Sequence, residues 1–180
     1  MDHELEIATL GGGCFWCLEA VFQQVDGVRA VESGYTGGHI GHPTYRQVCE
    51  GDTGHAEVVR VTFDPARITF REILEIFFKI HDPTQLNRQG NDVGTQYRSI
   101  IFTHSEAQRA VAEYVIGELV ANKVYDAPIV TQLEPAQPYW RAETSHQNYY
   151  QEHPAQGYCA FVITPKLAQF RRDFAERLRR

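Results

Sequence analysis

The order of strand-like and helix-like segments is the feature that most limits the folds open to this chain. Residues 57–63 alternate apolar and polar side chains, with Val59, Val61 and Phe63 on one face. This pattern indicates a strand that is buried on one side. Further strands are predicted at residues 6–10, 28–35, 99–102 and 129–133.

Helical periodicity marks several of the segments between these strands. Helices are predicted at residues 15–24, 70–80 and 105–122, and from Pro165 to the C-terminus. The helix at residues 70–80 is the best marked, because Thr69 precedes it and Glu72 at its third position completes a capping box.

Together these segments predict a fold of the α+β class. The first six follow the order β-α-β-β-α-β, which is typical of a ferredoxin-like α/β plait. Residues 39–54 and 81–96 are expected to be long loops, and residues 134–158 an irregular C-terminal arm. No linker or internal repeat divides the sequence, so residues 1–180 are expected to form a single domain.

Charge and composition argue against several classes of partner. The net charge is −6, so nucleic acid is not an expected partner. The one basic cluster is expected to be a solvated face of the last helix; it consists of Arg171, Arg172, Arg177, Arg179 and Arg180. The N-terminus lacks the pattern of a signal peptide, and no apolar run approaches the ~20 residues of a membrane span. A cytoplasmic location is therefore expected, with the four cysteines mostly reduced.

The most informative stretch for chemistry is Gly11-Gly12-Gly13-Cys14-Phe15-Trp16-Cys17. A cysteine between a glycine turn and a first helical turn faces free backbone N–H groups and the positive end of the helix dipole. Both favour the thiolate, which is the nucleophilic form of cysteine. Cys14 is therefore a candidate nucleophile, and the alternative is a small buried hydrophobic residue packed among core aromatics.

Two other functions fit the same cysteines. Cys14 and Cys17, together with His39 and His42, have the spacing of a structural zinc site, which would make the chain a binding module. The Cys-x-x-Cys pair also suits a general thiol–disulfide oxidoreductase. Neither a metal nor another cofactor is expected, because Cys17 falls inside a helical pattern and the chain is large enough to fold without metal. Cys49, in the predicted loop before the third strand, is interpreted as structural.

The sequence resembles the A-type methionine sulfoxide reductases, the peptide-methionine (S)-S-oxide reductases, along nearly its whole length. The resemblance begins at Gly13-Cys14-Phe15-Trp16, the counterpart of the family's nucleophile motif. Further matching segments follow in the family's order: Gly34-Tyr35-Thr36-Gly37-Gly38, Pro43-Thr44-Tyr45, Gly54-His55-Ala56-Glu57-Val58, Asp92-Val93-Gly94-Thr95-Gln96-Tyr97-Arg98-Ser99, His146-Gln147 and Gly157-Tyr158-Cys159.

This resemblance implies a monomeric enzyme that repairs oxidised proteins by reducing methionine-S-sulfoxide, free or in proteins, under oxidative stress. It implies that Cys14 attacks the sulfoxide sulfur and becomes a sulfenic acid. The roles it implies for the other site residues are a proton donor at Glu57, hydrogen bonds to the sulfoxide oxygen from Tyr45 and Tyr97, a methyl pocket from Phe15 and Trp16, and polar organisation by Asp92.

The resemblance also implies a redox-active disulfide that thioredoxin reduces. Cys159 matches the family's resolving position, in a Gly-Tyr-Cys segment expected to be flexible, and is favoured as the first resolving residue. Cys17 departs from the family pattern, in which many members carry glycine, and is the second candidate because it stands one helical turn after Cys14. His146 is expected either near the pocket or packed at the surface.

Overall fold

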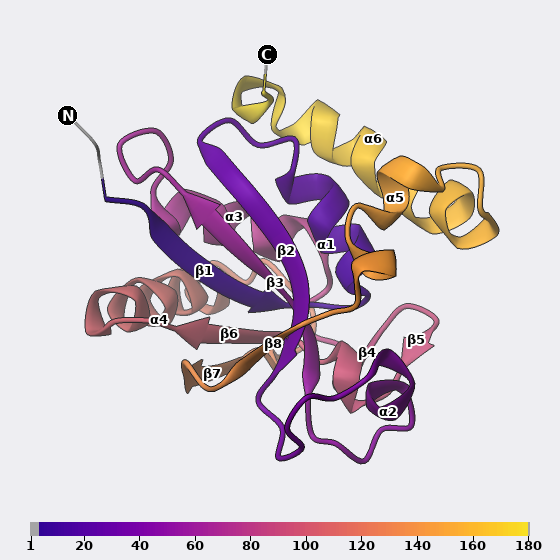
Figure 1. Cartoon of the computed structure of the whole chain (residues 1–180). Coiled ribbons are helices and arrows are strands. Elements are labelled where there is room, and N and C mark those ends of the chain that lie inside the picture. Colours follow the sequence, from indigo (N-terminus) through magenta and orange to yellow (C-terminus); the bar gives the residue numbers. More distant parts are fainter. Residues whose placement is uncertain (1–3, 180) are drawn as a thin grey trace.

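In the computed structural model, which describes residues 4–179, one curled sheet forms the centre of the molecule (Figure 1). Its six strands lie in the order β7-β6-β1-β3-β2-β8, and only β6 and β7 are parallel. Their bounds are β1 Glu6–Gly11, β2 Val28–Thr36, β3 Ala56–Phe63, β6 Ile100–Thr103, β7 Gln132–Pro135 and β8 Tyr139–Arg141. A separate two-stranded hairpin is formed by β4 Arg88–Gln89 and β5 Asp92–Val93.

The main helices are α1 Phe15–Phe22, α3 Phe70–Ile80, α4 Glu106–Ala121 and α6 Thr164–Asp173. Two shorter helices are α2 Tyr45–Cys49 and α5 Tyr149–Glu152. The remaining turns are 3₁₀ helices at Thr95–Tyr97, Thr144–His146 and Ala175–Arg177, and a π-helix at Cys159–Ile163. The chain is therefore of the mixed α+β class, as the sequence predicts.

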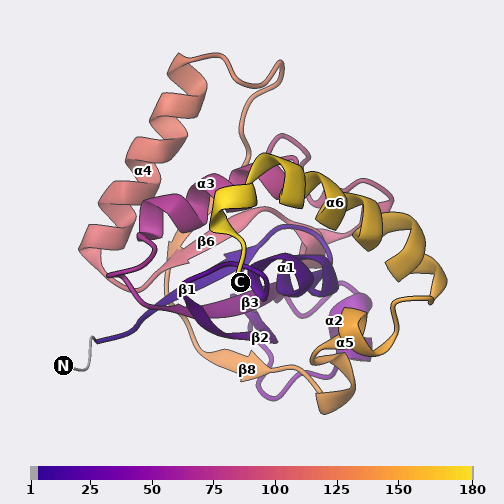
Figure 2. The same cartoon turned by 90° about the horizontal axis from the view of Figure 1, so that it is seen from above.

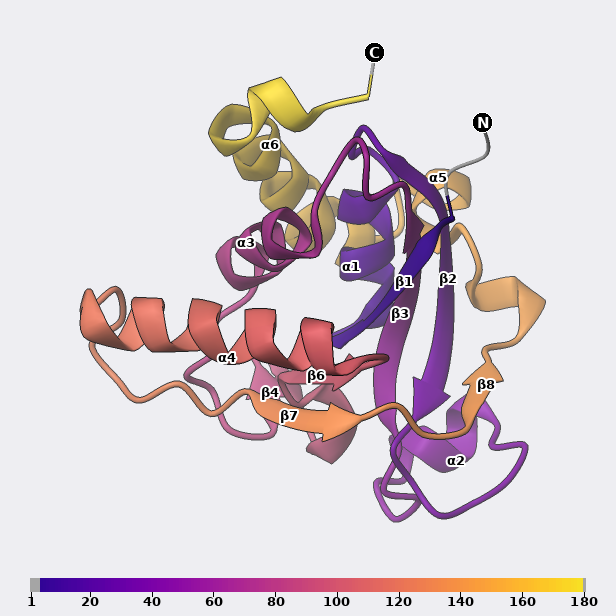
Figure 3. The same cartoon turned by 90° about the vertical axis from the view of Figure 1, so that its left-hand side faces the viewer.

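Helices α1, α3 and α6 lie together on one face of the sheet (Figures 2 and 3). Their apolar residues, including Phe22, Phe77 and Phe170, pack with strand residues such as Leu10 and Val61 into one large core. The opposite face carries a small cluster of Ala56, Val58, Ile100 and Phe102, covered by Tyr139. Among residues 4–179, no helix combines the length and the apolar character needed to cross a membrane.

Most of the predicted elements are confirmed, and α3 has the predicted bounds. The Thr69 hydroxyl accepts a hydrogen bond from the Glu72 N–H, and the Glu72 carboxylate accepts one from the Thr69 N–H, so the capping box is present. The strand predicted at 129–133 begins later, at Gln132. The reason is that the Val130 N–H bonds to the Pro83 carbonyl, so the chain pairs with β6 only after that point.

The segments predicted to be loops contain more structure than expected. Residues 39–54 include α2, which begins after a second capping box formed by Thr44 and Gln47. Residues 81–96 include the β4–β5 hairpin, and residues 134–158 include β8 and α5. The Thr44-x-x-Gln47 pattern is visible in the sequence, so α2 could have been predicted from it.

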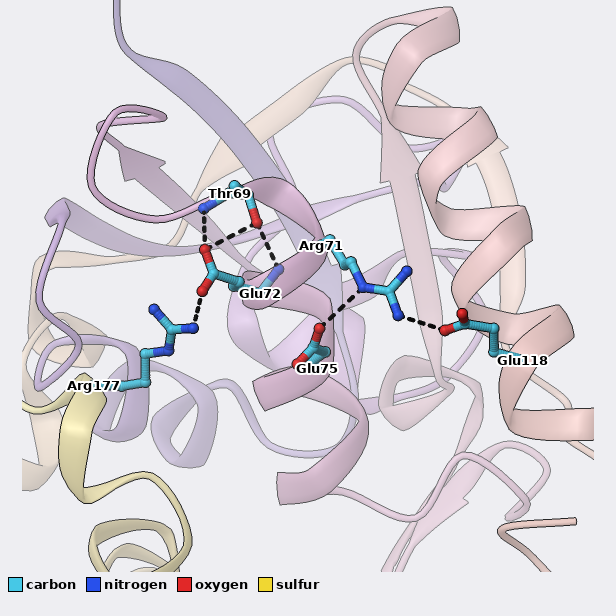
Figure 4. A network of polar contacts seen from close by, with 6 residues as sticks. All are labelled: Thr69, Arg71, Glu72, Glu75, Glu118 and Arg177. Atoms are coloured by element: carbon cyan, nitrogen blue, oxygen red, sulfur yellow. Dashed lines mark hydrogen bonds and ion pairs between the residues drawn. The ribbon is translucent and has the colours of Figure 1, made fainter. Parts of the chain in front are cut away.

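The basic C-terminal cluster is not simply a solvated face, because two of its arginines hold the chain end in place. Arg177 pairs with Glu72 on α3 (Figure 4), and the Arg179 guanidinium donates to the Val28 carbonyl. The cluster's last member, Arg180, lies outside the described residues. On the other side of α3, Arg71 bridges Glu75 and Glu118 and so connects α3 to α4. These contacts fix the helical layer that carries the cysteines.

We expect Thr69→Ala to lower the free energy of unfolding by ~1 kcal/mol, because it removes the side-chain half of the α3 cap. Thr69→Ser keeps the hydroxyl and should lose less than half as much. Urea unfolding of the three proteins measures the difference. An alanine variant as stable as the parent would show that the cap contributes nothing.

Candidate active site

Cys14 lies at the junction of β1 and α1, where it is the N-cap residue of the helix. Gly13 has φ +91°, a conformation that residues with side chains rarely adopt, and its N–H donates to the Tyr97 carbonyl at 3.1 Å. Gly12 lies so close to His81 that an added Cβ would come within 2.9 Å of the ring. The glycines therefore allow the chain to turn against its neighbours and present Cys14, which is 7% exposed.

Glu57 approaches this turn from β3. Its Oε1 accepts a hydrogen bond of 3.1 Å from the Phe15 N–H in the first turn of α1. Its Oε2 is buried and has no hydrogen-bond partner among residues 4–179. Burial raises the pKa of Glu57 to about 8, and the negative charges of Asp92 and Cys17 add to the effect against the Phe15 hydrogen bond. A buried carboxyl oxygen without a partner is costly, which marks this group for a functional role.

The two cysteines of the Cys-x-x-Cys pair are both buried and act on each other. Burial raises the pKa of Cys14 well above its usual value, and the neighbouring Cys17 and Glu57 add to this. The neighbouring Cys14 thiol lowers the pKa of Cys17 to about 7, and the positive charge of Lys166 adds to this. Burial favours the neutral thiol and opposes the backbone N–H groups of the helix N-terminus, so the Cys14 thiolate stays a prediction.

Aromatic rings surround the turn. Phe15 is fully buried and packs against Tyr35, Tyr45 and His146, with ring centroids 5.7–6.2 Å apart. Burial and the charge of Glu57 raise the pKa of the Tyr45 and Tyr97 hydroxyls, so both remain proton donors. The structure thus brings Phe15, Tyr45 and Tyr97 to the same place as Cys14 and Glu57.

Trp16 is half-buried and forms the outer part of this aromatic group. Its ring stacks on Tyr149 at 3.8 Å with an interplanar angle of 7°. Its Nε1 donates to His146 Nδ1 at 3.2 Å, and the His146 ring also packs 4.2 Å from Tyr45. His146 is therefore part of the site, which was one of its two expected locations.

Polar side chains on the C-terminal arm and on α1 hold the arm against the site; of these, Glu143 and Glu19 were given no role from the sequence. Glu143 accepts hydrogen bonds of 3.0 Å from the Tyr35 hydroxyl and the Tyr45 N–H. Gln147 bonds to both the N–H and the carbonyl of Ser33 on β2. Glu19 is buried beneath the start of α5, and burial raises its pKa to about 7. These contacts hold His146 and Tyr149 against Trp16.

Asp92 enters the site from the β4–β5 hairpin through Tyr158. The Tyr158 hydroxyl donates to Asp92 Oδ2 at 2.6 Å and lies 3.5 Å from Cys17 Sγ. Tyr158 also meets the edge of the Trp16 ring. Tyr158 was missed as a site residue; its position beside Cys159 was the only signal, since its partner Asp92 is 66 positions away.

The other two cysteines are not where they were expected. Cys159 is fully buried as the first residue of the π-helix, with its N–H donating to Gln156 Oε1 and its carbonyl accepting from the Thr164 hydroxyl. It is therefore not on a loose arm. Burial and the charge of Cys17 raise the pKa of Cys159. Cys49 ends α2 as an exposed residue outside the core, one helical turn after Tyr45.

The arrangement does not support the zinc alternative. Within the part of the chain that the structure describes, no three His, Cys, Asp or Glu side chains are grouped to hold a metal ion. His42 packs on Trp140, whereas Cys17 is buried in α1. The site instead combines a thiol, a buried carboxylic acid and hydroxyl donors in an aromatic shell. Such a set can attack a soft electrophilic atom while it protonates an oxygen.

Comparison with known proteins agrees with this chemistry. Residues 6–178 match the family model described as peptide methionine sulfoxide reductase. The peptide methionine sulfoxide reductase MsrA of Ralstonia nicotianae is 65% identical over 178 residues, which cover 97% of this chain and 93% of that protein.

Solved structures of similar proteins share the fold. Mxr1 from Saccharomyces cerevisiae in reduced form superposes with a TM-score of 0.80 at 35% identity, covering 88% of this chain and 92% of the Mxr1 chain. Mxr1 in complex with Trx2 gives a TM-score of 0.57 at 26% identity, covering 83% and 89%.

Proposed function

Because the chain belongs to the peptide methionine sulfoxide reductase family and is an oxidoreductase, we propose that it reduces methionine-S-sulfoxide, free or in oxidised proteins, with Cys14 as the nucleophile. The observation that carries this proposal is the buried, unpartnered Oε2 of Glu57 beside the Cys14 turn. It supplies the proton that the departing sulfoxide oxygen requires. The preference for the S epimer follows from the family resemblance.

In the first step Cys14 attacks the sulfoxide sulfur while Glu57 protonates the oxygen. In net terms the oxygen passes from the methionine sulfur to Cys14, which is oxidised by two electrons to a sulfenic acid as methionine is released. A pKa of about 8 keeps Glu57 protonated at neutral pH and ready to act as an acid. In net terms the Cys14 thiol proton replaces the one that Glu57 gives up, so thiol and sulfoxide become sulfenic acid and methionine.

The remaining site residues bind and orient the sulfoxide. Tyr45 and Tyr97 retain their protons and donate to the sulfoxide oxygen. Phe15 and Trp16 form the apolar surface for the S-methyl group, with Trp16 contributing the exposed part. Asp92, fixed by Tyr158, orients the polar side of the substrate.

Geometry favours Cys17 over Cys159 as the first residue to resolve the Cys14 sulfenic acid, the reverse of the order favoured from sequence. Cys17 stands one helical turn after Cys14, and its N–H donates to the Cys14 carbonyl at 3.1 Å. Side chains three positions apart on a helical turn lie ~5–6 Å apart at Cβ, so a small shift brings them within the ~3.5–4.5 Å of a disulfide. The Tyr158 hydroxyl lies 3.5 Å from Cys17 Sγ, so the residue next to Cys159 is in contact with Cys17. We therefore assign Cys17 to attack Cys14, and Cys159 to attack Cys17.

The final disulfide then needs an external dithiol, for which a thioredoxin is the proposed reductant. Mxr1 is similar to this chain, and its structure in complex with Trx2 supports this assignment.

We propose a single-domain monomer without a prosthetic group that repairs proteins under oxidative stress. A cytoplasmic location, where thiols stay reduced, suits a chain whose four cysteines are all free.

For the fold, we propose that the inner strands form the ferredoxin-like core. The order β6-β1-β3-β2, with every neighbouring pair antiparallel, supports this assignment. Strands β7 and β8 then extend the core on either side.

We expect Glu57→Gln to slow methionine formation in a single turnover by ~10²-fold or more, because the positioned acid is lost. In the parent protein this rate should fall as pH rises through about 8, where Glu57 loses its proton, and the variant should lack that decline. Rapid-quench measurement of methionine gives both results. An unchanged rate would remove Glu57 from the mechanism. As a control, both proteins should reduce a model disulfide equally well. The loss in the variant is then specific to the sulfoxide, which a general thiol–disulfide oxidoreductase would not show.

The order of the cysteines can be tested with Cys17→Ser and Cys159→Ser, each reduced and given one equivalent of methionine-S-sulfoxide. Cys159→Ser should form a Cys14–Cys17 disulfide as fast as the parent protein. Cys17→Ser should accumulate Cys14 sulfenic acid, trapped by a 1,3-diketone, because Cys159 is held in the buried turn of the π-helix. Peptide mass spectrometry identifies each product. Rapid formation of a Cys14–Cys159 disulfide in Cys17→Ser would restore the order favoured from sequence.

A further inference from the structure

The turn that carries the proposed last cysteine of the relay has two sides of different character. Cys159 and Ile163 point inward and are fully buried. Phe161 and Val162, on the same π-helix, are 83% and 38% exposed, and Phe161 is the most exposed of the described large hydrophobic side chains. The chain between α5 and α6 that contains this turn runs along the outer edge of the molecule (Figures 1 and 2).

We propose that Phe161 and Val162 form the docking surface for the dithiol protein that reduces this enzyme. This inference rests on the proposed function, because it requires Cys159 to belong to the disulfide that is finally reduced. The occupant is a protein of the thioredoxin type, with an apolar surface around its reactive thiol.

The chemistry forces such a partner to approach this turn. The thiolate of the reductant attacks the Cys159 sulfur, which breaks the Cys17–Cys159 bond and releases the Cys17 thiolate. The second thiol of the reductant then attacks the sulfur of the reductant's first cysteine in the mixed disulfide and releases Cys159. The partner is left oxidised and the enzyme reduced. In the mixed disulfide the two Cα atoms are only ~4.4–6.8 Å apart. Any partner that forms it must therefore cover residues two and three positions from Cys159.

Exposed apolar side chains at that position fit a brief redox encounter. Contacts of this kind are small, below ~1,200 Å² in total, so one or two apolar side chains account for much of the specificity. A π-helix is rare and usually a single turn at a functional site. Here it holds the thiol inward and the apolar pair outward, so the partner that binds the pair also meets the turn that must open to expose Cys159.

Other exposed apolar residues supply controls. Val120 on α4 is 60% exposed and lies on an element that contributes no residue to the site. Leu86, 65% exposed, precedes the β4–β5 hairpin that carries Asp92, so it tests docking of an oxidised polypeptide substrate. A general effect of removing surface apolar groups would appear in all of these variants.

The test compares steady-state reduction of methionine-S-sulfoxide driven by thioredoxin with the same reaction driven by dithiothreitol, a small dithiol that needs no docking surface. Phe161→Ser and Val162→Ser should raise the KM for thioredoxin, by roughly tenfold for Phe161. Turnover with dithiothreitol and single-turnover methionine formation should stay at parent values. Phe161→Leu should restore most of the affinity, and Val120→Ser should change nothing.

An unchanged KM for thioredoxin in both serine variants would overturn the docking proposal. The proposal would also be overturned if the serine variants raised the KM for an oxidised polypeptide and left the KM for thioredoxin unchanged, particularly if Leu86→Ser behaved in the same way. If Phe161→Ser does not fold, Val162→Ser still decides the question. Absence of methionine formation by the parent protein is a different result, which would reject the proposed function itself.

Discussion

The hydrogen bond from the Phe15 N–H to the Glu57 carboxylate connects the two halves of the proposed chemistry. It joins the first turn of α1, which carries the nucleophile, to β3 at the centre of the sheet. One carboxyl oxygen is occupied by this bond, and the other is left buried and unpartnered next to Cys14. The same contact therefore fixes the geometry of the turn and leaves one oxygen free to deliver a proton. Elements around the site, including the C-terminal arm with His146 and Tyr149, close over this pair.

Burial is the main physical cause of the proton arrangement. It raises the pKa of both Cys14 and Glu57, so it favours a thiol and a carboxylic acid in the resting site. Cys17, one helical turn after Cys14, is in position to attack it after oxidation.

The sequence predicted the local features well and the long-range ones poorly. The bounds of α3 follow from its capping box, and the position of Cys14 before α1 follows from its glycines. The family resemblance identified Glu57, Tyr45, Tyr97 and Asp92, which the fold brings near Cys14. The link from Tyr158 to Asp92 and the bonds of Glu143 and Gln147 on the arm to β2 join residues 66–114 positions apart, and no local pattern marks such pairs. The thiolate predicted at Cys14 follows from helix position, which is a local property, whereas the burial that opposes it depends on the whole fold.

The central claim is that Cys14, served by Glu57 and followed by two further thiols, reduces methionine-S-sulfoxide. The measurement that tests it most directly is the amount of methionine formed per chain when fully reduced protein meets an excess of this sulfoxide without any external reductant. A three-thiol relay returns Cys14 to the thiol form once, so the account predicts two methionines per chain, the second leaving Cys14 as a sulfenic acid. A value of one would mean that the third thiol does not take part. No methionine at all would contradict the account.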